Sequence, residues 1–194
     1  MAAHQKKTRR LNAALVFADE SGLLMAPLVQ RSWSRRGLTP VLRQRTRQHQ
    51  KVSVIAALIV SPHRQRVRLC FRLYPARNVD GDKVRAFLRQ LRCHVHGRFV
   101  LLWDRLGAHR CARVQAYVRR HRRIHLEWFP AYAPELNPME YGWSWLKTKP
   151  LANYAPPDAK DLATTARRHA CRLQHSVRLL WSFIDHSPLS LRHK

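Results

Sequence analysis

The sequence has 194 residues and carries 37 Lys and Arg against 11 Asp and Glu, which gives a formal net charge of +26 and a pI near 11.6. This length is enough for one domain with a sizeable core. The charge argues against an acidic protein as the only partner and makes a polyanion, above all nucleic acid, the expected one. Composition leaves the reaction open.

Several other classes are excluded by simple features. The four cysteines are widely spaced without a C-x-x-C pair, so neither a disulfide framework nor a zinc ribbon is indicated. The longest apolar run, Val52 to Val60, is far too short for a membrane span. The basic start resembles that of a signal peptide, but Asp19 and Glu20 interrupt the apolar segment behind it. We therefore expect a cytoplasmic protein without a membrane partner.

The first predicted strand follows a basic start. Residues 1–10 are predicted to be a disordered basic arm. Leu11 to Ala18 is almost wholly apolar and is bounded by charge on both sides, a pattern typical of a strand buried on both faces. This strand would deliver Asp19 at its C-terminal end, and strand alternation would turn Glu20 to the opposite face.

The region from Leu23 to Pro40 contains prolines, glycines and Trp33, and is predicted to be a hairpin or an irregular excursion. Gly37 is the natural position in it for a positive φ. Trp33 can stack on a nucleotide, but filling a small satellite core is the more frequent role for a tryptophan. We therefore expect Trp33 to be packed.

The next elements alternate between apolar runs and amphipathic stretches. Residues 52–60 and 67–73 are predicted to form an antiparallel pair, the first central and the second nearer an edge. Strands are then predicted at 99–103 and 124–129, and helices from Asp80 or Asp82 to His94 and over 111–122. Asp104 directly follows the strand at 99–103.

A long C-terminal helix is predicted after Pro156 and Pro157, with Asp158 as its cap. Its apolar positions alternate spacings of four and three residues, from Leu162 to Leu180. Such a seam packs on its own domain or on a second subunit, and we expect the first. Residues 151–194 would then form a helical extension of the domain.

These elements predict an α/β fold, with a mixed sheet and helices on both of its faces. The first three strands are joined too tightly for crossovers, whereas the later ones are separated by helices. Ligands of such sheets gather beyond the carboxyl ends of strands, where Asp19 and Asp104 are expected.

A third acidic residue is placed by the proline-rich segment before the next helix. Pro130 and Pro134 hold the chain extended. Asn137 is predicted to be the N-cap with Pro138 at the first helical position, which puts Glu140 in the first turn. The spacing of Asn137 and Glu140 also fits a capping box, in which the carboxylate has a purely structural role.

Three carboxylates, Asp19, Asp104 and Glu140, thus come from distant segments of a chain that is otherwise poor in acids. Clustered acids raise one another's pKa unless a cation lies among them. Hard divalent ions, Mg²⁺ or Mn²⁺, prefer such oxygen ligands and keep waters and phosphate as the others. Two ions about 4 Å apart can activate an attacking oxygen and stabilise a leaving one at a phosphodiester.

The motifs around these acids resemble those of a known family. They are Asp19-Glu20-Ser21, RSWSRRGLTP at 31–40, LLWDRLGAHR at 101–110 and the long, specific FPAYAPELNPMEYGWSWLK at 129–147. Together they resemble the catalytic region of DDE-superfamily endonucleases, the transposases of bacterial insertion sequences on the mariner-related branch. The resemblance covers about Leu11 to Lys149.

This resemblance implies a ribonuclease-H-like catalytic domain over residues 11–150, with Asp19, Asp104 and Glu140 as the metal-binding triad for two Mg²⁺ or Mn²⁺ ions. It implies cleavage of double-stranded DNA at element ends and transfer of the freed 3′-hydroxyl into target DNA. It further implies a nucleoid-associated bacterial protein, with a homodimer as one possible assembly.

The chain departs from the family pattern in three respects. The last two acids are separated by 35 residues, one more than is usual. Arg105 follows Asp104 where many relatives carry an amide or a small residue, and its cation would either weaken metal binding or contact the scissile phosphate. Relatives also carry an N-terminal helix-turn-helix region, which we expect from a separate reading frame unless this is a truncated copy.

Other residues have two interpretations each. His109 would orient a water or a phosphate, or bond to backbone at a helix start; Glu20 would be a spare ligand or face away. Lys147, two turns beyond Glu140, would contact DNA or be solvated. Two alternatives for the whole chain stay open, a non-catalytic nucleic-acid-binding remnant of a transposase and a ribonuclease-H-like nuclease acting on RNA or hybrids.

Overall fold

The computed structural model describes residues 10–26, 28–41, 50–189 and 191, so nearly all of the predicted basic arm lies outside it. In chain order the elements are β1 (Ala14–Leu24), β2 (Lys51–Val60), β3 (Val67–Pro75), α2 (Gly81–His94), β4 (Phe99–Trp103), α3 (Gly107–Arg110), α4 (Ala112–Arg120), β5 (Ile124–Trp128), a 3₁₀ turn (Pro134–Leu136), α5 (Met139–Thr148), α6 (Ala159–His175) and α7 (Val177–His186). Among the described residues, no helix has both the length and the apolar character needed to cross a membrane.

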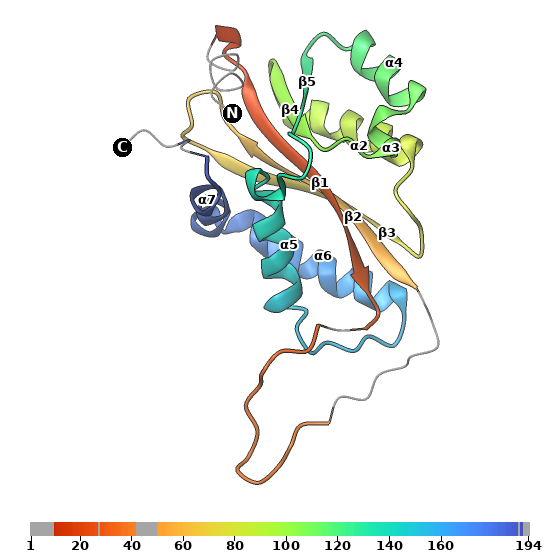
Figure 1. Cartoon of the computed structure of the whole chain (residues 1–194), viewed down its shortest axis with the longest axis vertical. Coiled ribbons are helices and arrows are strands. Elements are labelled where there is room, and N and C mark those ends of the chain that lie inside the picture. The colour runs from red at the N-terminus through yellow and green to blue at the C-terminus, as the bar shows by residue number, and fades with distance from the viewer. Residues whose placement is uncertain (1–9, 27, 42–49, 190, 192–194) are drawn as a thin grey trace.

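The five strands form one mixed sheet in the order β3-β2-β1-β4-β5. β1, β2 and β3 pair antiparallel, whereas β1, β4 and β5 pair parallel. Helices α2, α3 and α4 lie on one face, and α5, α6 and α7 cover the other (Figure 1). The predicted mixed sheet with helices on both faces is confirmed, with β2 inside the sheet and β3 at an edge.

Two apolar cores lie on opposite sides of β1, because its side chains alternate between the two faces. Val16 packs with Phe87 of α2 in one core. Phe17 packs with Trp143 of α5 in the other, and its ring stacks on Phe129 with centroids 6.4 Å apart. Burial on both faces explains why the sequence of this strand is almost continuously apolar.

The boundaries of β1 differ from the prediction. The strand begins at Ala14 and continues to Leu24, so Asp19 lies in its middle rather than at its end. The reason is the antiparallel ladder with β2, which continues past Asp19 to the pair Leu24 and Lys51. The charges of Asp19 and Glu20 therefore interrupt the apolar pattern without ending the strand.

The segment that follows β1 is irregular over the described residues 28–41. Gly37 has the expected positive φ, +82°. Asn153 fixes the start of the segment, since its side chain accepts from the Gln30 N–H at 2.8 Å and donates to the Gln30 carbonyl at 2.9 Å. Trp33 is 100% exposed, so the expected satellite core around it is wrong.

The predicted single C-terminal helix is two helices, α6 and α7, joined at Ser176. α6 begins after Asp158, whose side chain accepts from the Asp161 N–H at 2.7 Å, as the capping pattern predicted. Ser176 has φ −92° and ψ 74°, outside the helical range, and this breaks the run that the apolar spacing had suggested. α6 contacts β2 and β3, so the seam packs on its own sheet.

The other elements lie close to their predicted positions. α2 begins after Asp80, which accepts from the Lys83 N–H at 2.9 Å and acts as the N-cap. The helix predicted over 111–122 is the shorter α4, Ala112–Arg120. The short helix α3 precedes it and begins at Gly107, three residues after Asp104. This short helix matters because it carries His109, which contacts Asp104 directly after the end of β4.

Candidate active site

Three acidic side chains that are far apart in the sequence line one cavity of about 500 Å³. Asp19 comes from β1, Asp104 directly follows β4, and Glu140 lies in the first turn of α5. The segment from Phe129 to Pro134 closes another side of the cavity, together with Asn137. The structure thus brings the three predicted acids together.

The fold itself explains why they meet. β1 and β4 are parallel neighbours, paired as far as Phe17 and Leu102, so Asp19 and Asp104 follow this pairing on adjacent strands. α5 packs against β1 and brings Glu140 over the same place. The site lies at the carboxyl end of β4, as expected, although β1 continues beyond it.

Asp19 is buried, with only 7% of its surface exposed. Burial, reinforced by the nearby charge of Glu140, raises the pKa of Asp19 to about 8. The Trp143 indole N–H donates to Asp19 Oδ2 at 2.9 Å, which opposes that rise in pKa. Trp143 is buried in the core on this side of the sheet. Sequence reasoning missed its hydrogen bond to Asp19, whose only signal is that Trp143 follows Glu140 by three residues on the same helix.

The start of α5 differs slightly from the prediction. The helix begins at Met139, one residue late, because the preceding 3₁₀ turn leaves Pro138 in the N-cap position. Asn137 still supports the start, since its Oδ1 accepts from the Met139 N–H at 3.1 Å and its Nδ2 donates to the Ala18 carbonyl at 3.3 Å. These two bonds connect α5 directly to β1.

The capping-box alternative for Glu140 fails on this geometry. The Asn137 N–H, which a capping box would direct to Glu140, donates to the Pro134 carbonyl at 2.8 Å instead. The Glu140 side chain is exposed and lines the acid-lined cavity. Its carboxylate is therefore available to a ligand there.

Asp104 is held by groups behind the cavity. Its Oδ1 accepts from the Leu106 N–H at 3.2 Å and lies 2.7 Å from His109 Nδ1. On the other side of the ring, His109 Nε2 lies 2.8 Å from Glu20 Oε1. Burial alone would lower the pKa of His109, but hydrogen bonds and charges from Asp104 and Glu20 raise it to about 9.

For His109 and Glu20 the structure matches the second of the two predicted alternatives and adds a contact between them that was not predicted. His109 is 1% exposed and is not among the residues that line the acid-lined cavity. Its Nδ1 lies 3.2 Å from the Asp104 carbonyl, so the expected backbone contact exists beside the two carboxylate contacts. Glu20 faces away from Asp19, as strand alternation predicted, is partly buried, and lines with His109 a separate pocket of about 340 Å³.

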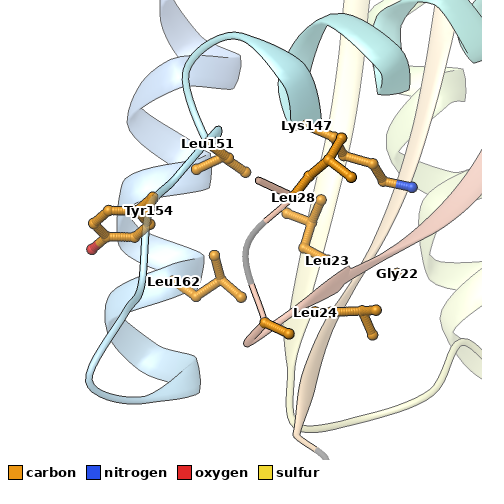
Figure 2. Close-up of a pocket in the computed structure, with 9 residues that line it drawn as sticks. Gly22, Leu23, Leu24, Leu28, Lys147, Leu151, Tyr154 and Leu162 are labelled. Atoms are coloured by element: carbon orange, nitrogen blue, oxygen red, sulfur yellow. The ribbon is translucent and has the colours of Figure 1, made fainter. Parts of the chain in front are cut away.

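The remaining predicted residues are spread around the molecule. Arg105 is exposed and lines the acid-lined cavity. Lys147 lines a separate, mainly apolar pocket of about 340 Å³ together with Leu24, Leu151 and Tyr154, and its amino group points away from Tyr154 (Figure 2). Trp33 lines neither hollow.

The donor set of the acid-lined cavity fits a hard divalent cation. Asp19 Oδ2 accepts from Trp143 and Asp104 Oδ1 lies at hydrogen-bond distance from His109, and both carboxylates line the cavity. Glu140 supplies a third carboxylate. Three such oxygens, with room for water and phosphate, suit Mg²⁺ or Mn²⁺.

The fold is ribonuclease-H-like, as comparison with solved structures shows. The Mos1 transposase paired-end complex with left transposon end matches with a TM-score of 0.65 at 16% identity, covering 95% of this chain and 58% of the Mos1 chain. The Mos1 paired-end complex with Mg gives 0.66 at 16% identity, over 96% and 56%. The catalytic domain of Mos1 mariner transposase gives 0.59 at 12% identity, over 97% and 90%.

The family is shown by the sequence itself. Residues 14–163 match the model of the DDE superfamily endonuclease family, and the chain belongs to that family. A search of the curated proteins found no match. The chain spans somewhat more than half the length of the Mos1 chains in the paired-end complexes.

Proposed function

We propose that this chain is the catalytic part of a transposase, which cuts double-stranded DNA at the ends of a mobile element and joins the freed 3′-hydroxyl to target DNA. Asp19, Asp104 and Glu140 would be its catalytic, metal-binding residues. The observation that carries the proposal is the meeting of these three acids in one cavity, with Asp19 buried beside Glu140. Membership of the endonuclease family supports the reaction class.

The three carboxylates of the cavity support a divalent metal as the cofactor. Asp19, Asp104 and Glu140 would hold Mg²⁺ or Mn²⁺, as two ions, and the bound metal would supply activation of the attacking oxygen and stabilisation of the leaving one at a phosphodiester. Mos1 complexes with Mg and with Mn are among the matching structures, and this supports the choice of ion. The protein's own contribution is to hold three carboxylates in place around a cavity that admits a phosphate.

Individual residues would have distinct tasks in this reaction. Trp143 holds one oxygen of Asp19, so the other oxygen faces the ligand. Asn137 ties the start of α5 to β1 and thereby sets where Glu140 stands relative to Asp19. Arg105, exposed at the cavity beside Asp104, would contact the phosphate of the strand being cut.

The charge of the chain supports DNA as the substrate. A formal charge of +26 would hold the sugar-phosphate backbone without reading its sequence, and binding would weaken steeply with salt. Recognition of the element ends would come from a helix-turn-helix region, and assembly as a homodimer would bring two ends together.

The test is cleavage of supercoiled plasmid DNA with Mn²⁺ by the wild-type chain and by Asp19→Asn, Asp104→Asn and Glu140→Gln. Each substitution should reduce cleavage by at least about a hundredfold. Losing a residue that only hydrogen-bonds to a metal ligand already costs about 10–100-fold, and losing the ligand itself should cost more. DNA binding, measured by gel shift at one fixed salt concentration, should be unchanged. Glu135→Gln, an exposed acid of the 3₁₀ turn, is the matched control and should cleave normally.

The outcomes separate the alternatives. Cleavage that survives any one of the three substitutions would remove that residue from the triad. A wild-type chain that binds DNA and neither binds Mn²⁺ nor cleaves would be a non-catalytic remnant. Parallel assays on RNA and on RNA–DNA hybrids would identify a ribonuclease if those were cut in preference to DNA.

A further inference from the structure

Three side chains in contact, Glu20, His109 and Asp104, lead from the far face of the sheet to the acid-lined cavity. Glu20 Oε1 lies 2.8 Å from His109 Nε2, and His109 Nδ1 lies 2.7 Å from Asp104 Oδ1. The side-chain exposure of the three residues is 12% for Glu20, 1% for His109 and 41% for Asp104. Only the last member of this chain faces the cavity.

The chain is fixed by its surroundings. The Trp103 indole N–H donates to Glu20 Oε2 at 3.4 Å, so both oxygens of Glu20 have partners. The Trp103 ring lies against the His109 ring, with centroids 4.0 Å apart. The Gln115 side chain donates to the His109 carbonyl at 3.1 Å. The imidazole therefore has little freedom to turn.

This fixed imidazole determines how Asp104 presents its carboxylate. Oδ1 is occupied by His109 Nδ1 and by the Leu106 N–H, one on the ring and the other on the backbone after the strand. Two partners on one oxygen oppose rotation of the carboxylate, which leaves Oδ2 for the cavity. Partners of this kind behind a ligand orient it and tune its basicity.

A metal ion shared by Glu20, Asp104 and His109 is a competing explanation, because their ligand atoms lie within 4.8 Å of one another. The geometry speaks against it. Nδ1 and Nε2 are on opposite sides of the ring, and each has its own carboxylate oxygen at hydrogen-bond distance. One ion cannot replace both contacts, whereas a hydrogen bond at each ring nitrogen accounts for both.

We infer that Glu20 is a positioning residue for the metal ligand Asp104, acting through His109 so that one oxygen of Asp104 is held by the protein and the other faces the metal. The inference rests on the proposed function, since it assigns Asp104 a metal. It extends that function to a residue on the opposite face of the sheet from Asp19. It means that metal affinity depends on Glu20, although Glu20 does not line the acid-lined cavity.

The first test measures Mn²⁺ binding by calorimetry without DNA, on the folded protein. Glu20→Ala should weaken Mn²⁺ affinity by about 10–100-fold, the usual cost of losing such a partner. Glu20→Gln keeps the size and one acceptor oxygen, so it should restore part of the affinity. Asp82→Asn, an exposed acid of α2 that pairs with Arg113, is the control and should bind as the wild type does.

A second test does not depend on metal. In the metal-free wild type, both ring N–H protons of His109 should give protected proton NMR signals, because both are buried and bonded. Glu20→Ala should lose the Nε2 signal and keep the other. Glu20→Gln should keep both, which also tests the chain if the alanine variant does not fold.

The outcomes distinguish a failure of this inference from a failure of the proposed function on which it rests. Wild-type Mn²⁺ affinity in folded Glu20→Ala, or two unchanged ring signals in it, would overturn the inference and leave the proposed function standing. A wild type that neither binds Mn²⁺ nor cleaves DNA would overturn both. Weakened affinity in Glu20→Ala with partial recovery in Glu20→Gln would support the inference, since a purely structural role would lower stability without this pattern.

Discussion

Asp19 and Glu20 are neighbours on β1, and both carboxylates are largely enclosed, yet their surroundings differ completely. Glu20 points to the α2 side and meets an imidazole at 2.8 Å. Asp19 points to the α5 side, where it meets the Trp143 N–H and the charge of Glu140. One acid has a cationic partner within the protein, and the other has a second acid.

The difference shows how neighbours decide what a buried acid can do. The two carboxylates around His109 raise the pKa of its ring to about 9. The protonated ring is then the counter-charge of both carboxylates. The pKa of Asp19 rises to about 8, and no basic side chain of the described residues is among the groups that set it. Asp19 and Glu140 together therefore need a cation from solution.

The largest effect should come from removing the charge of Asp19 while keeping its shape. Asp19→Asn should lose DNA cleavage by at least about a hundredfold, whereas Glu20→Gln should lose much less, since only Asp19 would touch the metal. Single-turnover cleavage of plasmid DNA with Mn²⁺ measures both. Equal losses in the two variants would remove the distinction between ligand and positioning residue.

The next largest effect should be the dependence of metal-free stability on pH, which reports the titration of Asp19. Asp19 has a pKa of 3.8 when unfolded and about 8 when folded. Between these values the folded state holds the extra proton, so the free energy of unfolding should fall as pH rises, by at most about 1.4 kcal/mol per pH unit. Urea unfolding in EDTA at several pH values measures this.

Asp19→Asn is the control for that experiment and should lack this part of the fall. His109 adds a fall of its own between its ordinary pKa of 6.5 and about 9, and the variant keeps it. The difference between the two proteins therefore isolates Asp19. Parallel curves for wild type and variant would show that Asp19 titrates normally.

Trp143→Phe should have an intermediate effect on cleavage. The change keeps the aromatic packing and removes the N–H bond to Asp19 Oδ2. We expect cleavage to fall about 10–100-fold, because the Asp19 carboxylate would keep its charge but lose the bond that orients it. Trp145→Phe on the same helix is the control, and activity in Trp143→Phe equal to that control would show that packing alone matters.

A smaller effect is expected at the connection between α5 and β1. Asn137→Ala removes the bonds to the Met139 N–H and the Ala18 carbonyl, and should lower the free energy of unfolding by about 1–2 kcal/mol. Urea denaturation measures the change. An unchanged midpoint would mean that packing of α5 alone fixes Glu140 beside Asp19.

The smallest effect on stability is expected at Trp33, which has no part in the surroundings of Asp19 or Glu20. Trp33 is fully exposed, so Trp33→Ala should change the free energy of unfolding by no more than about 0.5 kcal/mol. Thermal melting of the two proteins measures this. A clear loss of stability would show that Trp33 is packed in solution.

Local pattern was enough to predict the elements whose own residues determine them. The apolar run of β2 and the cap of α2 at Asp80 are examples. The position of Asp19 within β1 was not predictable, because it depends on a ladder with β2 that continues past two charges. The break at Ser176 was missed because the apolar spacing continues through it.

The candidate site divides in the same way. Its three acids could be selected from sequence, because each stands out beside an apolar run or a helix start in a chain poor in acids. The bonds of Trp143 to Asp19 and of His109 to Glu20 could not, since they join residues 124 and 89 positions apart. Neither bond leaves a local pattern that one sequence can reveal.

The position of Asp19 in the middle of β1 also affects how the site can adjust. Its backbone lies in the ladder opposite Ala56, and the preceding residues pair with β4 as well, so its amide should be among the slowest to exchange with solvent. Glu140 stands exposed at the first turn of a helix behind an irregular segment. If the proposed metal and DNA bind, we expect Asp19 to stay in place and Glu140 to make any movement that closes the site.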